Sequence, residues 1–218
     1  MPFFVRVCVT ARHNIISSGY VKIIGVTYGG KMHGTGAVML KGDSALLVNR
    51  KPFFIPDEVE HMVSYPALAL RVSRLGKQVA PRFATRYFDA VAPALDLQAM
   101  DLRDTAIRLA QPWTEAVSMD GSFPVGGWTE VADTARQTWC GKWEHRIEGS
   151  KNATIFEGEC SVETITEAVS IVSKNMTIRQ GDIIYLQLTE TPVDLHPNDT
   201  ITAILNEDEQ NALFCRIK

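Results

Sequence analysis

Short segments with alternating hydrophobic and polar positions recur along this chain of 218 residues, and they outnumber segments with helical spacing. Alternation with a period of two is typical of half-buried strands, and short continuous apolar runs fit fully buried ones. These patterns predict strands over residues 22–28, 37–40, 44–48, 63–72, 138–147, 183–188, 200–205 and 213–217. Residues 148–152 (EGSKN) and 206–209 (NEDE) separate neighbouring strands and predict two hairpin turns.

The clearest helix is predicted over residues 161–174. Its apolar residues recur at helical spacing and form one face, which comprises Val162, Ile165, Val169 and Val172. The Ser161 hydroxyl can cap the first turn by accepting a hydrogen bond from the backbone. Since strands outnumber helices, the patterns together predict an α+β protein dominated by mixed or antiparallel sheet.

A second, shorter helix is predicted to begin at Pro81. Proline at the first helical position loses no hydrogen bond that the helix needs. Phe83, Tyr87 and Val91 follow at a spacing of four and fall on one apolar face. Pro93 is expected to end this helix, because proline cannot continue the hydrogen-bonded ladder.

The composition predicts a single domain over residues 1–218, since the chain is 45% hydrophobic and long enough for one large core. The formal net charge of −3 gives no electrostatic reason to expect nucleic acid or an anionic membrane as a partner. No apolar run reaches the roughly 18 residues that a membrane-spanning helix needs. The four cysteines are widely spaced without a CxxC pair, which favours a reducing cytoplasm over a disulfide or metal framework.

Seven short pieces of the chain occur in the order and with the spacing of a known family. They are residues 41–46 (KGDSAL), 52–56 (PFFIP), 74–77 (RLGK), 86–91 (RYFDAV), Asp96 with Asp101 and Leu102, 120–122 (DGS), and 181–185 (GDIIY) before 191–192 (TP). From about residue 22 to the C-terminus, the chain resembles the fumarylacetoacetate hydrolase family of acylpyruvate hydrolases, isomerases and decarboxylases. Residues 1–21 have no counterpart in this resemblance. Shared pieces of this kind speak for fold more than for activity, because function belongs to sites.

The resemblance implies a compact β-roll with a few short helices, a site in its mouth and a homodimer. It also implies a Mg²⁺ or Mn²⁺ ion held by three carboxylates, two from a Glu-x-Glu pair on a strand and one from an Asp farther on. Counting from the motifs on either side places that pair on Tyr65 and Ala67, and neither can replace a carboxylate. Asp96 alone remains as a metal-ligand position, so the metal is expected to be lost. Glu58 and Glu60 have the right spacing but lie too early, and a solvated turn is the stronger interpretation.

Further site positions follow from the same resemblance. His33 falls near a histidine that acts as a base or positions water, and a solvated loop histidine is the alternative. A lysine of relatives falls on Val117, and a glycine of the loop that cradles the substrate carboxylate falls on Glu190. A negative side chain there would repel an anionic substrate. The positions expected to contact substrate are Asp120, Ser122, Thr189 and Thr191.

Loss of metal ligands beside retained fold residues predicts a catalytically impaired or inactive homologue. Such a pseudoenzyme would have a structural role, or would bind a small 2-oxo acid or a protein partner. The alternative is an active hydrolase, isomerase or decarboxylase of 2-oxo acids with a rearranged site around Asp96 and His33. In both cases Asp96 is expected to be buried and paired, because an unpaired buried charge is costly. Tyr65 is the first candidate for its hydrogen-bond partner.

Overall fold

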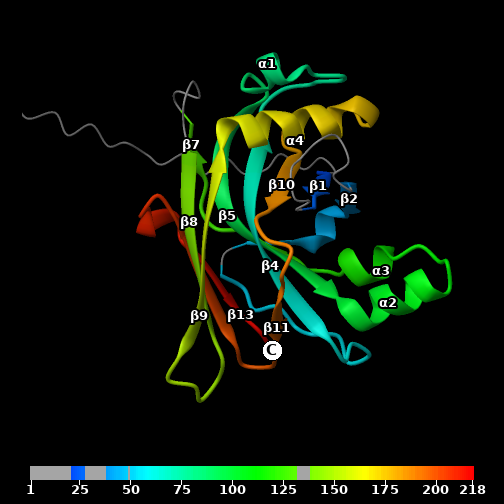
Figure 1. Ribbon diagram of the computed structural model, residues 1–218, viewed down its shortest axis with the longest axis vertical. Coiled ribbons are helices and arrows are strands. Elements are labelled where there is room, and N and C mark those ends of the chain that lie inside the picture. Colours follow the sequence, from blue (N-terminus) through cyan, green and yellow to red (C-terminus); the bar gives the residue numbers. More distant parts are fainter. Residues whose placement is uncertain (1–20, 28–37, 49, 132–137) are drawn as a thin grey trace, which may run out of the picture.

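The computed structural model describes residues 21–27, 38–48, 50–131 and 138–218 (Figure 1). The larger sheet has the strand order β2 (Val38–Lys41), β1 (Ile23–Val26), β10 (Ile183–Gln187), β4 (Met62–Val72), β5 (Phe88–Ala99) and β7 (Thr129–Glu130), with β11 (Val193–Leu195) also paired to β4. A smaller sheet has the order β13 (Leu213–Arg216), β12 (Thr200–Leu205), β8 (Thr138–Arg146) and β9 (Ala153–Ser161). A third, parallel pair joins β3 (Leu46–Leu47) to β6 (Phe123–Pro124). Among the described strands of the larger sheet, only β1 and β10 pair in parallel, so the predicted β-rich α+β class with mixed sheets is confirmed.

The helices are few and short. They are α1 (Pro81–Ala84), α2 (Met100–Arg108), α3 (Thr114–Val117) and α4 (Val162–Asn175), with short 3-10 turns η1 (Asp43–Ala45) and η2 (Glu209–Asn211). The predicted cap of α4 is confirmed, since the Ser161 hydroxyl oxygen accepts from the Thr164 N–H at 3.3 Å. α4 lies across one end of the larger sheet and buries its predicted apolar face (Figure 1). Among the described residues, no helix is both long and apolar enough to cross a bilayer.

The helix predicted from Pro81 to Pro93 is wrong over most of its length. α1 ends at Ala84, and β5 begins at Phe88. Val91 lies fully buried in β5, where it pairs with Leu70 of β4. The helical spacing of three apolar residues was outweighed by a twelve-residue strand that is buried on both faces. Such strands read as continuous hydrophobic runs, and their pairing partners lie far away in the sequence.

Two prolines lie inside the longest strands without breaking them. The Pro66 carbonyl accepts from the Leu188 N–H, and the Pro93 carbonyl accepts from the Gly126 N–H, each at 2.9 Å. The nitrogen and carbonyl of one strand residue point to the same side, so neither proline interrupts the ladder between β4 and β5. Pro66 occupies the place where the neighbour of β4 changes from β10 to β11. Pro66 is therefore tolerated, because its missing N–H falls between the residues of β4 that pair with β10 and those that pair with β11.

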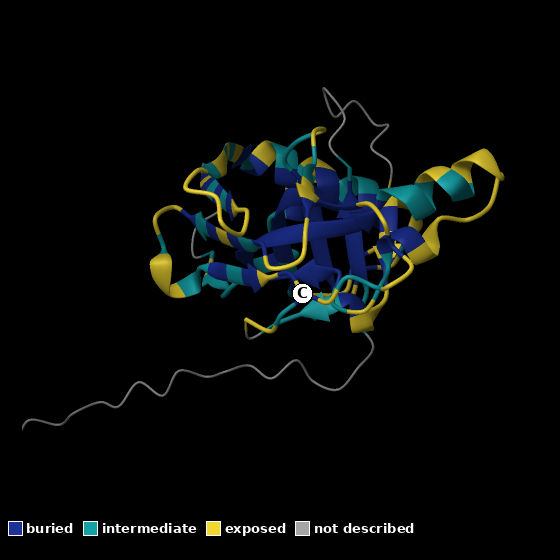
Figure 2. Cartoon of the chain, turned by 90° about the horizontal axis from the view of Figure 1, so that it is seen from below, coloured by how far each residue is buried: buried dark blue, intermediate teal, exposed yellow. Residues whose placement is uncertain are grey.

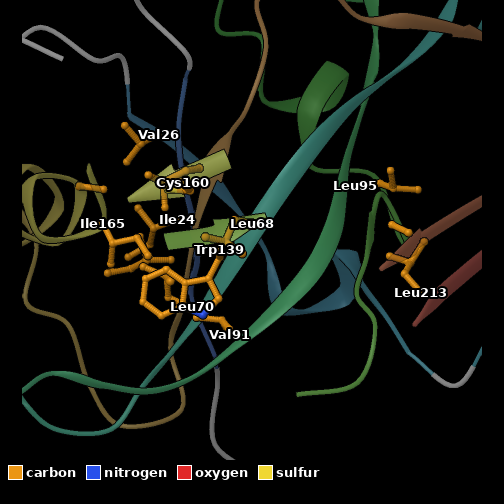
Figure 3. Close-up of a cluster of buried hydrophobic side chains, with 14 of the residues drawn as sticks. Ile24, Val26, Leu68, Leu70, Val91, Leu95, Trp139, Cys160, Ile165 and Leu213 are labelled. Carbon is orange, nitrogen blue, oxygen red and sulfur yellow. The ribbon is translucent and has the colours of Figure 1, made fainter. Parts of the chain in front are cut away.

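The larger sheet packs on both faces. The face toward the smaller sheet and α4 carries large side chains such as Leu68 and Leu70, which share one core cluster with Trp139 of β8 (Figure 3). The other face packs against β3 and β6. It carries small residues and the ring of Tyr185, whose centroid lies 4.7 Å from that of the tilted Phe123 ring of β6. Buried residues concentrate along the central strands (Figure 2). The small residues of this second face are Ala67, Ala69, Ala92 and Ala94, and polar side chains gather next to them.

Candidate functional site

The candidate site is a polar cluster on the second face of the larger sheet, with Asp96 at its centre. Tyr65 pairs directly with Asp96 across β4 and β5, and Ala67 pairs with Ala94 on one side and Gln187 on the other. Directly paired residues of an antiparallel ladder lie on the same face of the sheet. The two positions expected for the metal-binding pair, Tyr65 and Ala67, therefore lie on the same face as Asp96, as the counting predicted.

Asp96 is completely buried, and both of its oxygens are in use. Oδ1 lies 2.8 Å from the Nζ of Lys41, whose side chain is also fully buried. Oδ2 accepts two hydrogen bonds, from the amide nitrogens of Gln98 and Gln187, each at 2.7 Å. The prediction that Asp96 is buried and meets a basic side chain is confirmed. A buried carboxylate requires such partners, because its charge has lost the stabilisation of water.

The cation beside Asp96 is the ammonium of Lys41, the last residue of β2. Its ammonium also donates to the backbone carbonyl of Leu97 at 3.1 Å and to the carbonyl of Val117. The carbonyl and hydroxyl oxygens of Ser122 lie 3.3 and 3.2 Å away. Five oxygens thus surround one nitrogen that has three protons to donate. The ammonium joins β2, β5, the end of α3 and the start of β6 at one point.

The electrostatics of the cluster follow from its burial. Burial lowers the pKa of Lys41, and the neighbouring Asp96 carboxylate acts in the opposite direction. Burial raises the pKa of Tyr185 well above its ordinary value, and the negative charge of Asp96 adds to this effect. The Tyr185 hydroxyl is a neighbour of Asp96, and its interaction with that carboxylate favours the protonated phenol. Tyr185 is therefore neutral, and its ring fills the space beside Gly25, where a Cβ atom would lie 2.3 Å from Cζ.

Tyr65 does not bond Asp96 as expected. Its phenol is paired with Arg103 of α2, and burial raises the pKa of this phenol while Arg103 lowers it. An Arg103 Nη1 proton also reaches the Gln98 side-chain oxygen at 3.3 Å. The expectation was wrong because a cation was available to both groups: Lys41 to the carboxylate and Arg103 to the phenol. The oxygens of Asp96 are already engaged by the Lys41 ammonium and by the amides of Gln98 and Gln187.

The residues present do not fit a Mg²⁺ or Mn²⁺ ion. Hard divalent cations need several oxygen ligands, and a magnesium site normally includes carboxylates together with water. In the part of the chain that the structure describes, no group of three or more His, Cys, Asp or Glu side chains could hold a metal. An ammonium already lies 2.8 Å from Asp96 Oδ1, and it would repel a second cation at the same oxygen. Glu58 and Glu60 are exposed in the turn before β4, as the solvated-turn interpretation predicted.

The other predicted site residues are dispersed. His33 lies outside the described residues. Ser122 is fully buried and contacts Lys41, so the structure brings it to the cluster, whereas Asp120 is exposed in a turn. Thr189 and Thr191 form a local turn, in which the Thr191 N–H donates to the Thr189 hydroxyl at 3.0 Å. This turn follows β10 shortly after Gln187, which itself bonds Asp96.

Sequence reasoning missed three members of the cluster: Lys41, Gln98 and Gln187. A usable signal existed for Lys41, because residues 38–41 (VMLK) form a strand in which Met39 and Lys41 are buried while Val38 and Leu40 are exposed. A period-two pattern cannot say which distant carboxylate such a lysine meets. Gln98 and Gln187 had no local signal beyond standing at or near the ends of apolar runs.

Comparison with known proteins places the chain in a family. The model described as "Fumarylacetoacetate (FAA) hydrolase C-terminal" matches residues 30–209. "Oxaloacetate tautomerase FAHD1, mitochondrial" from Bos taurus is 29% identical over 174 residues, which are 76% of this chain and 74% of that protein.

Solved structures show the same fold at lower identity. Yeast ynq8, a fumarylacetoacetate hydrolase family protein, superposes with a TM-score of 0.74 at 19% identity, over 90% of this chain and 92% of that one. A fumarylpyruvate hydrolase from Pseudomonas aeruginosa, solved in complex with Mn²⁺ and pyruvate, superposes with a TM-score of 0.73 at 15% identity, over 91% and 89%.

Proposed function

Because the chain belongs to the fumarylacetoacetate hydrolase family, we propose that it is a member in which a buried lysine takes the role of the cation, with a binding or structural function in place of metal-dependent catalysis. The observation that carries this proposal is the contact of 2.8 Å between Lys41 Nζ and Asp96 Oδ1. The carboxylate has one oxygen paired with an ammonium and the other held by two amides. It has no free oxygen to offer to a divalent ion.

The ligand that best suits a binding function is a small 2-oxo acid. Relatives support this choice, since one is named for oxaloacetate and a solved one holds pyruvate. In this chain the half-buried Arg103 guanidinium lies beside Tyr65 and offers a positive group at the edge of the cluster. A protein partner is the other binding role, and a purely structural role would need no ligand at all.

A homodimer in the cytoplasm completes the proposal. Exposed apolar side chains support a protein contact, and those on or after α2 are Ile107, Leu109 and Trp113. Apolar surface of this kind is a common feature of subunit interfaces. Sedimentation equilibrium tests the dimer. Fractionation of cells that express the tagged full chain tests the location, which differs from that in the names of the mitochondrial relatives.

Calorimetric titration with Mg²⁺ and Mn²⁺ tests the loss of the metal. The Pseudomonas fumarylpyruvate hydrolase serves as the positive control, because it has been solved with Mn²⁺. We expect heat of binding from the control and none from this chain. Site-specific binding tighter than millimolar, abolished by Asp96→Ala, would refute the proposal.

The competing function is an active hydrolase, isomerase, tautomerase or decarboxylase of 2-oxo acids, and the names of relatives favour it. It would use Asp96, Asp120 or the pair Glu58 and Glu60, together with His33. Oxaloacetate and acylpyruvates, each assayed with and without added Mg²⁺, distinguish the two functions. Turnover above buffer that disappears in Asp96→Asn would establish the enzyme, whereas no turnover beside a working relative supports the binding or structural role.

A further inference from the structure

A second polar site lies behind the first, on the opposite face of β4 and β5. A cavity of about 20 Å³ separates the two sheets at this point. Pro66 and Leu95 form part of its wall, and they are the sequence neighbours of Tyr65 and Asp96, which face the candidate site. His145 of the smaller sheet lines the cavity from the other side. Most of the remaining lining is apolar, so the few polar atoms decide what can bind.

The imidazole of His145 is fixed by a buried carboxylate. Its Nε2 lies 2.8 Å from Asp199 Oδ2, and the exposed fractions of the two residues are 5% and 0%. Asp199 also accepts from the backbone N–H groups of His196 at 2.9 Å and Glu148 at 3.4 Å. An ionised carboxylate only accepts hydrogen bonds, so Nε2 carries the proton. In the neutral ring, Nδ1 is then an acceptor with a free lone pair.

That nitrogen is buried and has no hydrogen-bond partner among the described residues. A buried polar atom without a partner is rare in folded proteins, and a bound water is a common explanation. Two hydroxyl residues, Ser64 and Thr154, line the same cavity as His145. A cavity needs roughly 10–15 Å³ and two to four polar partners to hold one water. The volume suffices for one such molecule, and the apolar lining offers no partners for a larger polar ligand.

We propose that this cavity is a binding site for one water molecule, which donates a hydrogen bond to His145 Nδ1 and is completed by the hydroxyls of Ser64 and Thr154. A continuous chain of hydrogen bonds then runs from Asp199, which directly precedes β12, through His145 of β8 and the water to Ser64 of β4. This site is independent of the proposed function, because none of its polar residues contacts Asp96 or Lys41 in the described structure. Exposed Thr154, at the rim, gives the water a route to solvent.

The wild-type chain provides the decisive test. A crystal structure at high resolution and neutral pH should show a water at a hydrogen-bonding distance of about 3 Å from His145 Nδ1. Long-range ¹H–¹⁵N spectra should show the tautomer protonated at Nε2, with the Nδ1 resonance shifted toward that of a hydrogen-bonded acceptor. Clear density without a water, or a ring protonated at Nδ1 alone, overturns the proposal.

A pair of variants adds a second readout. Ser64→Val replaces one wall hydroxyl by a methyl group and adds a second methyl group beside it. It should remove the water and move the Nδ1 resonance toward that of an unbonded nitrogen. Thr202→Val makes a similar change on an exposed position of β12 and should alter neither. An unchanged water and resonance in Ser64→Val contradicts the proposed coordination. If Ser64→Val does not fold, the wild-type density and spectrum decide the question alone.

Discussion

Replacing Lys41 by methionine removes the ammonium beside Asp96 and keeps a long, unbranched side chain in its place. The variant leaves the Asp96 carboxylate without the cation that lies 2.8 Å from its Oδ1. It also leaves the Leu97 and Val117 carbonyls and the Ser122 oxygens without the donor that they share. Removing one partner of a buried pair costs about 3–5 kcal/mol, because the remaining charge is uncompensated. We therefore expect the free energy of unfolding to fall by about that amount.

Lys22→Met is the matched control. Lys22 pairs with the carboxylate of Asp182 at 2.6 Å, but its side chain is 33% exposed. Asp182 also keeps the backbone N–H groups of Lys22 and Arg179 as donors. A pair of this kind is screened by water, so the control should lose only about 0.2–1 kcal/mol. Urea unfolding at one protein concentration measures both variants, and the fluorescence of the buried Trp139 and Trp143 reports the transition.

The double variant Lys41→Met, Asp96→Asn tests whether charge is the cause. If the two groups stabilise each other, the cost of the double variant should fall short of the summed single costs by about 0.5–3 kcal/mol. Two results would refute the reasoning. One is a cost for Lys41→Met no larger than that for Lys22→Met, and the other is additivity of the two single changes.

Three further predictions concern the rest of the fold. Ser161→Ala removes the cap of α4 and should lower the free energy of unfolding, measured with urea, by about 1 kcal/mol. An unchanged urea midpoint would show that the cap does not stabilise the protein. Gly25→Ala should prevent folding or lower the melting temperature strongly, because the new Cβ would lie 2.3 Å from the buried ring of Tyr185; a soluble variant of wild-type stability contradicts this packing. Burial raises the pKa of Cys160 and Cys215 to about 12, so the folded thiols stay protonated while the unfolded ones ionise above pH 9. The free energy of unfolding should therefore fall as pH rises from 9 toward 12, by about 1 kcal/mol per pH unit for each thiol, and replacing both by alanine should reduce that slope.

Local pattern alone determined most of the strands and the longest helix. The capped amphipathic run of α4 and the hairpins of the smaller sheet need only their own residues to be recognised, because hydrophobic periodicity and turn residues act over a few positions. The placement of Tyr65 and Ala67 on the same face of the sheet as Asp96 was also predictable. Side chains alternate between the two faces of a strand, and the motifs on both sides of β4 determine the alignment of this strand with the family. The burial of Asp96 followed from its apolar neighbours.

Tertiary structure alone decided which groups meet. No local pattern identifies Lys41 as the partner of Asp96, because β2 and β5 are separated by three other strands in the order of the sheet. The folded chain brings this ammonium to the oxygens of residues 96, 97, 117 and 122. The same non-local pairing made a strand of residues 88–99, where the spacing of Phe83, Tyr87 and Val91 favoured a helix. Hydrophobic periodicity predicts which face of a strand a residue lies on. It does not predict which distant residue packs against that face, because those contacts form only in the folded chain.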